Sequence, residues 1–273
     1  MQYKILIIAP AWVGDMVMAQ TLFKALKRQY GTRLILDVYA SIWAVELLLR
    51  MPEVNNIIYN PFTHGKLKVF NRISEGLRLK RNKYDQVFVL PNSFKSALIP
   101  LFAKIKKRTG FVGESRYGLL NDIYKLDKQK LPLMIDRFCA LASNGEKPEY
   151  IEWPKLQVNR DNRVQLITKF AINIKQPIIA FCPGAEYGPS KQWRVEHFAK
   201  LGDIANAHNY QVIILGSNKD MSVADAIVEL SNTHLINLCG KTTLGDVVDL
   251  LSLATHVVTN DSGLMHIACA LGV

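Results

Sequence analysis

Short apolar runs rich in Val and Ile alternate with helical patterns along most of this chain, and this alternation constrains the fold most strongly. The runs predict strands over residues 4–9, 33–39, 54–59, 85–90, 108–112, 178–182, 211–215, 235–238 and 256–259. Helical patterns follow near 16–30, 43–50, 66–83, 94–104, 133–142, 195–208, 220–231, 244–253 and 263–271. Strands that alternate with helices of this length form parallel sheets covered on both faces. The sequence therefore predicts an α/β fold of the doubly wound type.

The composition changes between residues 144 and 160, where Gly145, Pro148 and Pro154 interrupt the periodicity. Pro and Gly are typical of linkers between domains. We therefore predict two Rossmann-like domains, residues 1–147 and 148–273, that face each other across a cleft. Ligands of such folds bind outside the carboxyl ends of the strands, so the loops after the strands are the candidate sites.

The overall composition is typical of a soluble globular protein, with 49% hydrophobic and 21% charged residues. The sequence has no apolar run of the ~18 residues that span a bilayer. Its first residues predict a strand rather than a signal peptide, which favours a cytoplasmic location. The four cysteines, Cys139, Cys182, Cys239 and Cys269, lie far apart in the sequence. We expect them to be reduced and buried, with no part in metal binding.

The formal net charge is +11, and the basic residues gather in the first half of the chain. One cluster consists of Lys66, Lys68, Arg72, Arg78, Lys80, Arg81 and Lys83, and the other of Lys104, Lys106, Lys107 and Arg108. A nucleic acid, an anionic membrane face or an acidic substrate would each explain such a charge. Solvated helix faces would explain it equally well.

Residues 257–259 end a predicted strand, and Asn260-Asp261-Ser262-Gly263 lead into the next helical pattern. Asp261 and Ser262 are favourable N-cap residues, and Gly263 permits a close approach by backbone or ligand. A helix N-terminus presents free N–H groups and a partial positive charge, which suits a phosphate group. The alternative is a well-capped turn without a ligand.

A second long loop, residues 183–193, follows the strand at 178–182 and contains two glycines and two prolines. It places Lys191 and Arg194 at the mouth of the predicted cleft, where a lysine could hold a diphosphate as a point charge. Trp193 could stack on a base, but packing is the more frequent role of a tryptophan at the start of a helix.

Two further loops of the second half carry small polar residues after their strands. Asp220 could accept hydrogen bonds from ribose hydroxyls or could cap the following helix. Thr242 and Thr243 follow Gly240, and Thr243 is the expected cap of the next helix. The Gly-x-Gly-x-x-Gly pattern of dinucleotide sites is missing, so no dinucleotide cofactor is expected.

In the first half, Gly14-Asp15 follows the first strand and offers a carboxylate at the same type of position. Asp15 could be a general base, which typically contributes about 10²–10⁴-fold in rate, or the N-cap of a helix that starts at Met16. His266, three residues into an apolar helix, fits a core histidine better than a catalyst. The sequence shows no metal-ligand spacing and no hydrolase elbow.

Taken together, these motifs resemble glycosyltransferase family 9, whose members are heptosyltransferases of lipopolysaccharide synthesis. The resemblance rests on Val13-Gly14-Asp15, Pro183-Gly184-Ala185, Lys191-Gln192-Trp193 and the stretch from Asn260 to His266. Pro91-Asn92-Ser93-Phe94-Lys95-Ser96, Arg108-Thr109-Gly110-Phe111 and the stretch from Arg116 to Asn121 are similar to the members that add the second heptose. The resemblance implies a GT-B fold with an acceptor domain followed by a nucleotide-sugar domain.

The family pattern also implies roles for individual residues. Asp15 and Lys191 match the catalytic base and the cation that neutralises the leaving diphosphate. Donor-binding residues would be Gly184, Lys191, Asp220, Thr242, Thr243, Asp261, Ser262, Gly263 and His266. Acceptor-binding residues would be Gly14, Asn92, Ser93, Lys95, Arg108 and Arg116. The resemblance implies neither a metal ion nor a cofactor.

The implied reaction is inverting transfer of L-glycero-D-manno-heptose from ADP-heptose to the first heptose of an inner core linked through Kdo to lipid A. Its acceptor would place the enzyme in the cytoplasm, at the periphery of the inner membrane, with no nucleic-acid partner. The family pattern continues past Val273 with further strands and a helix, so we expect a truncated chain with an incomplete second domain. A nucleotide-sugar epimerase and an inactive fragment are the alternatives.

Overall fold

The computed structural model describes residues 2–62, 68–185 and 189–273, and the chain divides into two compact units, residues 1–154 and 155–273. The sequence predicts a boundary seven residues earlier, after residue 147. Residues 150 and 152 lie against unit 1, since Lys24 pairs with Glu152 at 2.6 Å and the Arg28 guanidinium lies 5.1 Å from the Tyr150 ring centroid. Because of these contacts, residues 148–154 belong to unit 1, and the boundary between the units lies after residue 154 and not after residue 147.

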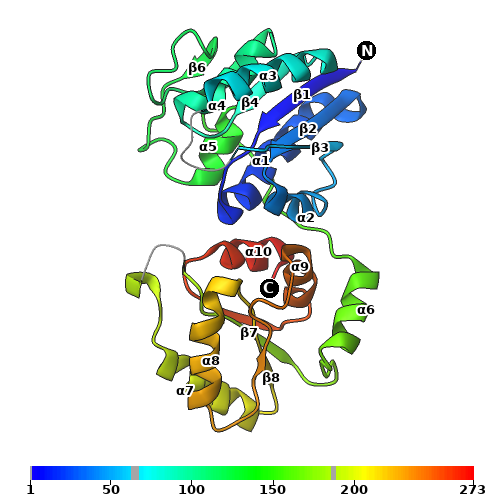
Figure 1. Ribbon diagram of the computed structural model, residues 1–273, viewed down its shortest axis with the longest axis vertical. Coiled ribbons are helices and arrows are strands. Elements are labelled where there is room, and N and C mark those ends of the chain that lie inside the picture. Colours follow the sequence, from blue (N-terminus) through cyan, green and yellow to red (C-terminus); the bar gives the residue numbers. More distant parts are fainter. Residues whose placement is uncertain (1, 63–67, 186–188) are drawn as a thin grey trace. The chain divides into compact units, whose positions relative to one another are not determined.

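Unit 1 contains a parallel sheet whose strand order is β3-β2-β1-β4-β5-β6 (Figure 1). Its strands are β1 (Tyr3–Ile8), β2 (Leu34–Ala40), β3 (Asn56–Tyr59), β4 (Gln86–Val89), β5 (Lys107–Phe111) and β6 (Asp122–Tyr124). All adjacent pairs of these strands are parallel. Ile5, Leu6 and Ile7 of β1 are fully buried, which is why the central strand is a continuous apolar run.

The helices of unit 1 are α1 (Val13–Tyr30), α2 (Val45–Leu48), α3 (Val69–Leu79), α4 (Phe94–Phe102) and α5 (Met134–Ala140). α1 packs beside α5, and α3 packs beside α4. Gly31 ends α1 as predicted, because it adopts a positive φ of 59° and its N–H donates back to the Lys27 carbonyl. α1 begins at Val13 rather than Met16, so Gly14 and Asp15 lie inside its first turn.

Unit 2 contains a second parallel sheet with the strand order β10-β7-β8-β9. Its strands are β7 (Ile178–Cys182), β8 (Gln211–Ile214), β9 (Ile236–Asn237) and β10 (His256–Thr259). Its helices are α6 (Arg160–Lys169), α7 (Val195–Ala207), α8 (Met221–Leu230), α9 (Leu244–Leu251) and α10 (Gly263–Leu271). α7 packs beside α8, while α9 contacts both α6 and α10 (Figure 1). The aromatic pair Phe181 and Phe198 is fully buried in the core of this unit.

These two parallel sheets confirm the predicted α/β fold class. Three of the four cysteines are buried, and burial raises the pKa of the Cys239 thiol to about 12. Cys269 is exposed, so the expectation that all four are buried is wrong.

No helix in the described ranges is long and apolar enough to cross a membrane, and no His, Cys, Asp and Glu cluster there could hold a metal ion. Lys66 of the first basic cluster and loop residues 186–188 lie outside the described residues.

Candidate functional site

Four loops of unit 2 begin where its four parallel strands end. Gly184 follows β7, Asp220 follows β8, Thr242 follows β9, and Asp261 follows β10. Because adjacent strands of this sheet are parallel, their carboxyl ends meet at one edge. The predicted donor-binding residues of the four loops therefore share one edge of one sheet.

Lys191 and Asp261 form an ion pair on this edge, although 70 positions separate them in the sequence. Lys191 ends the short 3-10 turn Pro189–Lys191 just before α7, and its ammonium donates a hydrogen bond to the Asp261 carboxylate. This hydrogen bond is the main reason why the pKa of Asp261 lies below its ordinary value. The two side chains are 44% and 60% exposed, so the ammonium group is accessible to a ligand.

Asn260, which is not among the predicted site residues, holds three segments of this edge together. Its side chain is buried, and its amide nitrogen donates to the Pro183 carbonyl at 2.7 Å. Its amide oxygen accepts the Trp193 backbone N–H at 3.0 Å. The loop after β7, the start of α7 and the end of β10 are therefore fixed to one side chain. Its place directly after β10, at the start of the Asn-Asp-Ser-Gly loop, is the signal that could have found it.

Trp193 packs within unit 2, as the more frequent role predicts. Its ring meets the Phe198 ring edge-on, with centroids 5.0 Å apart, and stacks on the His197 ring at 5.3 Å. These contacts favour packing over base stacking.

Asp220 belongs to a capping box that precedes α8. One carboxylate oxygen accepts both the Ser217 backbone N–H and the Ser217 hydroxyl, each at 2.8 Å. A Cβ atom at Gly184 would lie 2.5 Å from the other oxygen, and one at Gly216 would lie 2.9 Å from the Asp220 Cβ. Both loops approach Asp220 so closely that only glycine fits. Asp220 occupies the N-cap position of α8, but its side chain makes no capping hydrogen bond to that helix, so the expected helix cap is wrong. Its carboxylate closes the capping box of the turn Asn218–Asp220 instead, and contact with ribose stays a prediction.

The two threonines after β9 differ in their hydrogen bonding. Thr243 caps α9 as predicted, because its hydroxyl accepts the Asp246 N–H at 3.2 Å and Asp246 accepts the Thr243 N–H at 3.0 Å. The Thr242 hydroxyl is buried and has no hydrogen-bond partner among the described residues. A buried hydroxyl without a partner is costly, and Thr242 carries such a group on this edge.

The first turn of α10 has no side-chain cap in the described structure. Ser262 occupies the N-cap position, but its hydroxyl lies 3.4 Å from the Thr259 hydroxyl instead of capping the N–H groups. The helix that starts at Gly263 therefore offers its N-terminal N–H groups and partial positive charge to an anion. His266 is only partly buried, close enough to Asp261 to contribute, after Lys191, to the lowering of the Asp261 pKa. It is thus no core histidine.

In unit 1, Asp15 lies in the first turn of α1, directly after β1. The N-cap position belongs to Trp12, so the N-cap alternative for Asp15 is wrong. Gly14 is buried, whereas Asp15 is partly exposed. A partly exposed carboxylate at the carboxyl edge of the central strand is suitably placed for proton transfer.

Asn92, Ser93 and Lys95 follow β4, which neighbours β1 in the sheet. Ser93 directly precedes α4, and the sequence predicts that it caps this helix; it occupies the N-cap position but makes no capping hydrogen bond, so that prediction is wrong. Glu114 supplies it instead, because its carboxylate accepts the Phe94 N–H at 2.6 Å. Lys95 is partly exposed and contributes its backbone carbonyl to Arg72 at 3.4 Å.

Arg116 was predicted to contact an acceptor, but the structure gives it an internal role. It is 1% exposed, and its guanidinium donates to the Phe111 and Pro91 carbonyls. The same group lies 3.3 Å from both the Asn92 amide oxygen and the Ser96 hydroxyl. Burial lowers the pKa of Arg116 to about 10. Direct contact with a ligand is therefore excluded in this conformation, and Arg116 shapes the Asn92 loop from beneath.

Arg108 also departs from its predicted role. It lies near the start of β5, at the edge of the sheet opposite to the carboxyl ends of the strands. Its guanidinium donates to the Leu119 carbonyl at 2.6 Å and to the Ile105 carbonyl at 2.7 Å. Three more residues of β5 follow Arg108 before the strand ends. At a rise of ~3.3 Å per residue, they separate its backbone from the carboxyl ends of the strands. We therefore correct Arg108 to a structural residue.

Comparisons with known proteins show the family of the chain. The sequence model of glycosyltransferase family 9 (heptosyltransferase) matches residues 72–273. Lipopolysaccharide heptosyltransferase 2 of Escherichia coli is 45% identical over 98% of this chain and 80% of its own length. Lipooligosaccharide heptosyltransferase 2 of Haemophilus ducreyi is 46% identical, with the same shares covered.

A solved structure extends this similarity to three dimensions. The structure of E. coli ADP-heptose lps heptosyltransferase II matches with a TM-score of 0.90 at 44% identity, and covers 98% of this chain and 82% of its own. The match confirms the expectation of a GT-B type fold. The sequence, the two parallel sheets and the sites at their edges agree: the chain belongs to glycosyltransferase family 9, and it is a glycosyltransferase.

Proposed function

We propose that this chain transfers L-glycero-D-manno-heptose from ADP-heptose to the first heptose of the lipopolysaccharide inner core, with inversion at the anomeric carbon. The proposal combines the family membership with one structural observation. Lys191, which pairs with Asp261, shares the carboxyl edge of the unit 2 sheet with the uncapped N-terminus of α10. The exposed ammonium and the free N–H groups of that helix start are donors suited to a diphosphate, which would compete with Asp261 for Lys191.

Negative charge grows on the diphosphate as its bond to the sugar breaks. The Lys191 ammonium and the N–H groups of the first turn of α10 would stabilise that charge, and this is the role that a metal ion fills in many nucleotide-sugar enzymes. The Thr242 hydroxyl and the Asp220 carboxylate, on neighbouring loops, are the proposed contacts of the nucleoside. Transfer should consequently proceed unchanged in the presence of EDTA.

Asp15 is the proposed general base of the reaction. Its carboxylate would take the proton from the acceptor hydroxyl while that oxygen attacks the anomeric carbon from the face opposite to the leaving ADP. The position of Asp15 in the first turn of α1, partly exposed and at the end of β1, supports this role. Gly14, Asn92, Ser93 and Lys95 remain the proposed acceptor contacts of unit 1.

The acceptor proposed here is a Kdo-containing glycolipid at the cytoplasmic face of the inner membrane. Kdo carboxylates and lipid phosphates are anionic, and the chain carries a net charge of +11. Long-range attraction between them would fall with rising ionic strength. The proposal includes a location in the cytoplasm, at the periphery of the inner membrane, and no nucleic-acid partner.

The test is to incubate the chain with ADP-heptose and a heptosylated Kdo–lipid A acceptor and to analyse both substrates by mass spectrometry. The proposal predicts an acceptor heavier by one heptose residue, together with free ADP. A free rearranged sugar with an unmodified acceptor would instead indicate epimerase chemistry. Donor binding without any change in donor or acceptor would contradict the proposal and favour an inactive fragment.

A further inference from the structure

The segment from residue 68 to residue 83, which comprises α3 and the turn after it, concentrates the charge of the chain. It carries six basic residues and one acidic residue, a net charge of +5 within the total of +11. Five of the basic residues are exposed, namely Lys68, Arg78, Lys80, Arg81 and Lys83. The acidic residue, Glu75, is bound to Arg78. Sixteen residues therefore supply nearly half of the net charge.

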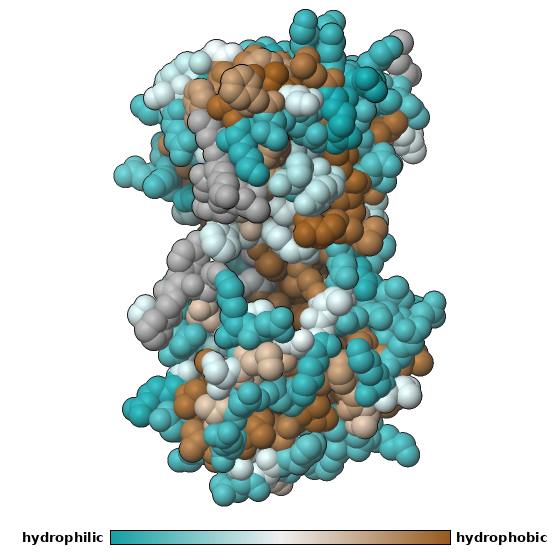
Figure 2. Space-filling view, in the orientation of Figure 1, coloured by the Kyte–Doolittle hydropathy of each residue, from teal (hydrophilic) through white to brown (hydrophobic). Residues whose placement is uncertain are grey.

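The same segment exposes large apolar side chains. Phe70 is 86% exposed and Leu77 is 51% exposed. Residues seven positions apart in a helix lie on one face, two turns from each other. Figure 2 shows brown apolar surface over the region of α3 and α4, bordered by teal hydrophilic residues. An exposed aromatic ring and a leucine on one helical face, flanked by cations, indicate a surface that meets a partner.

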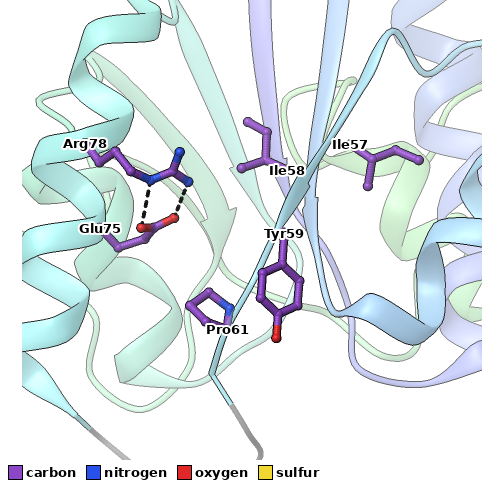
Figure 3. A pocket seen from close by; sticks show the side chains of 6 residues that line it. All are labelled: Ile57, Ile58, Tyr59, Pro61, Glu75 and Arg78. Carbon is purple, nitrogen blue, oxygen red and sulfur yellow. Dashed lines mark hydrogen bonds and ion pairs between the residues drawn. The ribbon is translucent and has the colours of Figure 1, made fainter.

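A hollow next to α3 extends this surface onto the edge strand β3. It has a volume of about 540 Å³ and is lined by Ile57, Ile58, Tyr59, Pro61, Glu75 and Arg78. Figure 3 shows the Arg78–Glu75 pair of α3 facing Ile58, Tyr59 and Pro61. Tyr59 is 53% exposed. The hollow thus adds apolar side chains of the edge strand β3 and the loop after it to the surroundings of α3, beside the Arg78 guanidinium.

We propose that this surface, formed by the exposed side chains of α3, its following turn and Tyr59, docks on an anionic lipid bilayer. Exposed apolar anchors with flanking Lys and Arg are the combination that binds membrane interfaces, where the apolar groups enter the acyl boundary and the cations meet lipid phosphates. A nucleic acid would bind the cations of this surface but would not bury the Leu77 side chain. The exposed apolar side chains therefore favour a lipid bilayer over a nucleic acid as the partner. The inference deepens the proposed function and rests on it, because a lipid-anchored acceptor requires the enzyme to reach a membrane.

Co-sedimentation with vesicles tests the proposal. The chain should bind vesicles that contain phosphatidylglycerol more tightly than pure phosphatidylcholine vesicles, and added salt should weaken binding. Phe70→Ser with Leu77→Ser, and separately Lys80→Glu with Arg81→Glu, should each weaken binding to the anionic vesicles by at least about tenfold. Matched controls in unit 2 are Val164→Ser with Ile204→Ser and Lys175→Glu with Lys200→Glu, all at exposed positions. The controls should bind as the parent chain does.

Activity on two acceptors separates this inference from the proposed function. The α3 variants should transfer heptose normally to a deacylated, water-soluble acceptor but slowly to the same acceptor embedded in vesicles. If the α3 variants bind vesicles like the parent chain, the docking surface is wrong, whatever the activity. If the parent chain modifies neither acceptor, the proposed function fails, while the vesicle result still decides the docking surface.

Discussion

Asn260 lies between three segments, and its amide group is hydrogen-bonded on both sides. Asn260→Ala would leave the Pro183 carbonyl and the Trp193 N–H without partners in a buried place. We expect a loss of about 2–4 kcal/mol in the free energy of unfolding of unit 2, since each buried unsatisfied group costs about 1–3 kcal/mol. Urea denaturation measures this loss. Asn173→Ala is the control, because Asn173 bonds at the surface, and equal stability of the two variants would contradict the role of Asn260.

Lys191→Ala removes the cation that we assign to the leaving diphosphate. A hydrogen bond to a charged group contributes about 1.5–3 kcal/mol, and more in a site that excludes water. The variant should lose at least about tenfold in kcat/KM for the donor. Lys200→Ala replaces an exposed lysine on α7 and should not change the rate. Normal turnover of Lys191→Ala would remove this residue from the mechanism.

The same variant should shift the titration of Asp261. The hydrogen bond from Lys191 lowers the pKa of Asp261 in the folded chain, so the ion pair stabilises the fold above the ordinary carboxyl pKa. That contribution is lost as the pH falls through the lowered pKa, and it is small because both groups are exposed. In Lys191→Ala the pKa of Asp261 should rise toward its ordinary value, as NMR titration of the carboxyl carbon would show. An unchanged pKa would mean that the pair does not form in solution.

Residue types and their distance from strand ends predict which side chains gather, but not what each one contacts. Lys191 and Asp261 were selected separately, and the structure joins them in an ion pair. In the sequence, Arg116 cannot be distinguished from an arginine that binds a ligand. In the structure it is buried under the Asn92 loop. The burial of Arg116 depends on how the segments after β4 and β5 pack, which residue type and spacing along the sequence do not reveal. Asn260 was missed because an amide that joins loops has no sequence spacing of its own.

At the scale of elements, α4 illustrates a cap supplied from a distant segment. Glu114, from the connection between β5 and β6, accepts the N–H of Phe94, while Ser93 occupies the N-cap position without capping. Glu114→Ala should therefore cost about 1 kcal/mol of stability. Ser93→Ala, the matched substitution at the nominal cap, should cost less than about 0.5 kcal/mol. Thermal unfolding of both variants measures the difference, and the reverse order would show that Ser93 is the true cap.

Elements with strong patterns were predicted closely, and elements with weak patterns were missed. β7, β10 and α10 have the predicted bounds, because each is a short apolar run or a clear apolar helix between turn residues. The sequence predicts no helix over α6, because Leu166 is its one buried residue and the pattern lacks an apolar stripe. Its signal was Asn159, whose side chain accepts two N–H groups of the first turn. β6 has three residues at a sheet edge, too few for a periodic signal.

At the scale of the whole molecule, the strand and helix rhythm predicted two parallel sheets, and both are present. The rhythm cannot assign a substrate to either unit, because fold and function are separable. The motifs at the strand ends, Asp15 after β1 and Lys191 with Asp261 in unit 2, carry that information. These motifs predict glycosyltransferase family 9, and the comparisons show that the chain belongs to it.

The central claim, glycosyl transfer with Asp15 as the base, is tested most directly by the turnover of Asp15→Asn. This substitution keeps the size of the side chain and removes its ability to take a proton. We predict that kcat for heptose transfer falls by about 10²–10⁴-fold, with the donor KM nearly unchanged. Asp161→Asn, at an exposed position in the first turn of α6, should retain the parent rate. A parent-like kcat for Asp15→Asn would contradict the account.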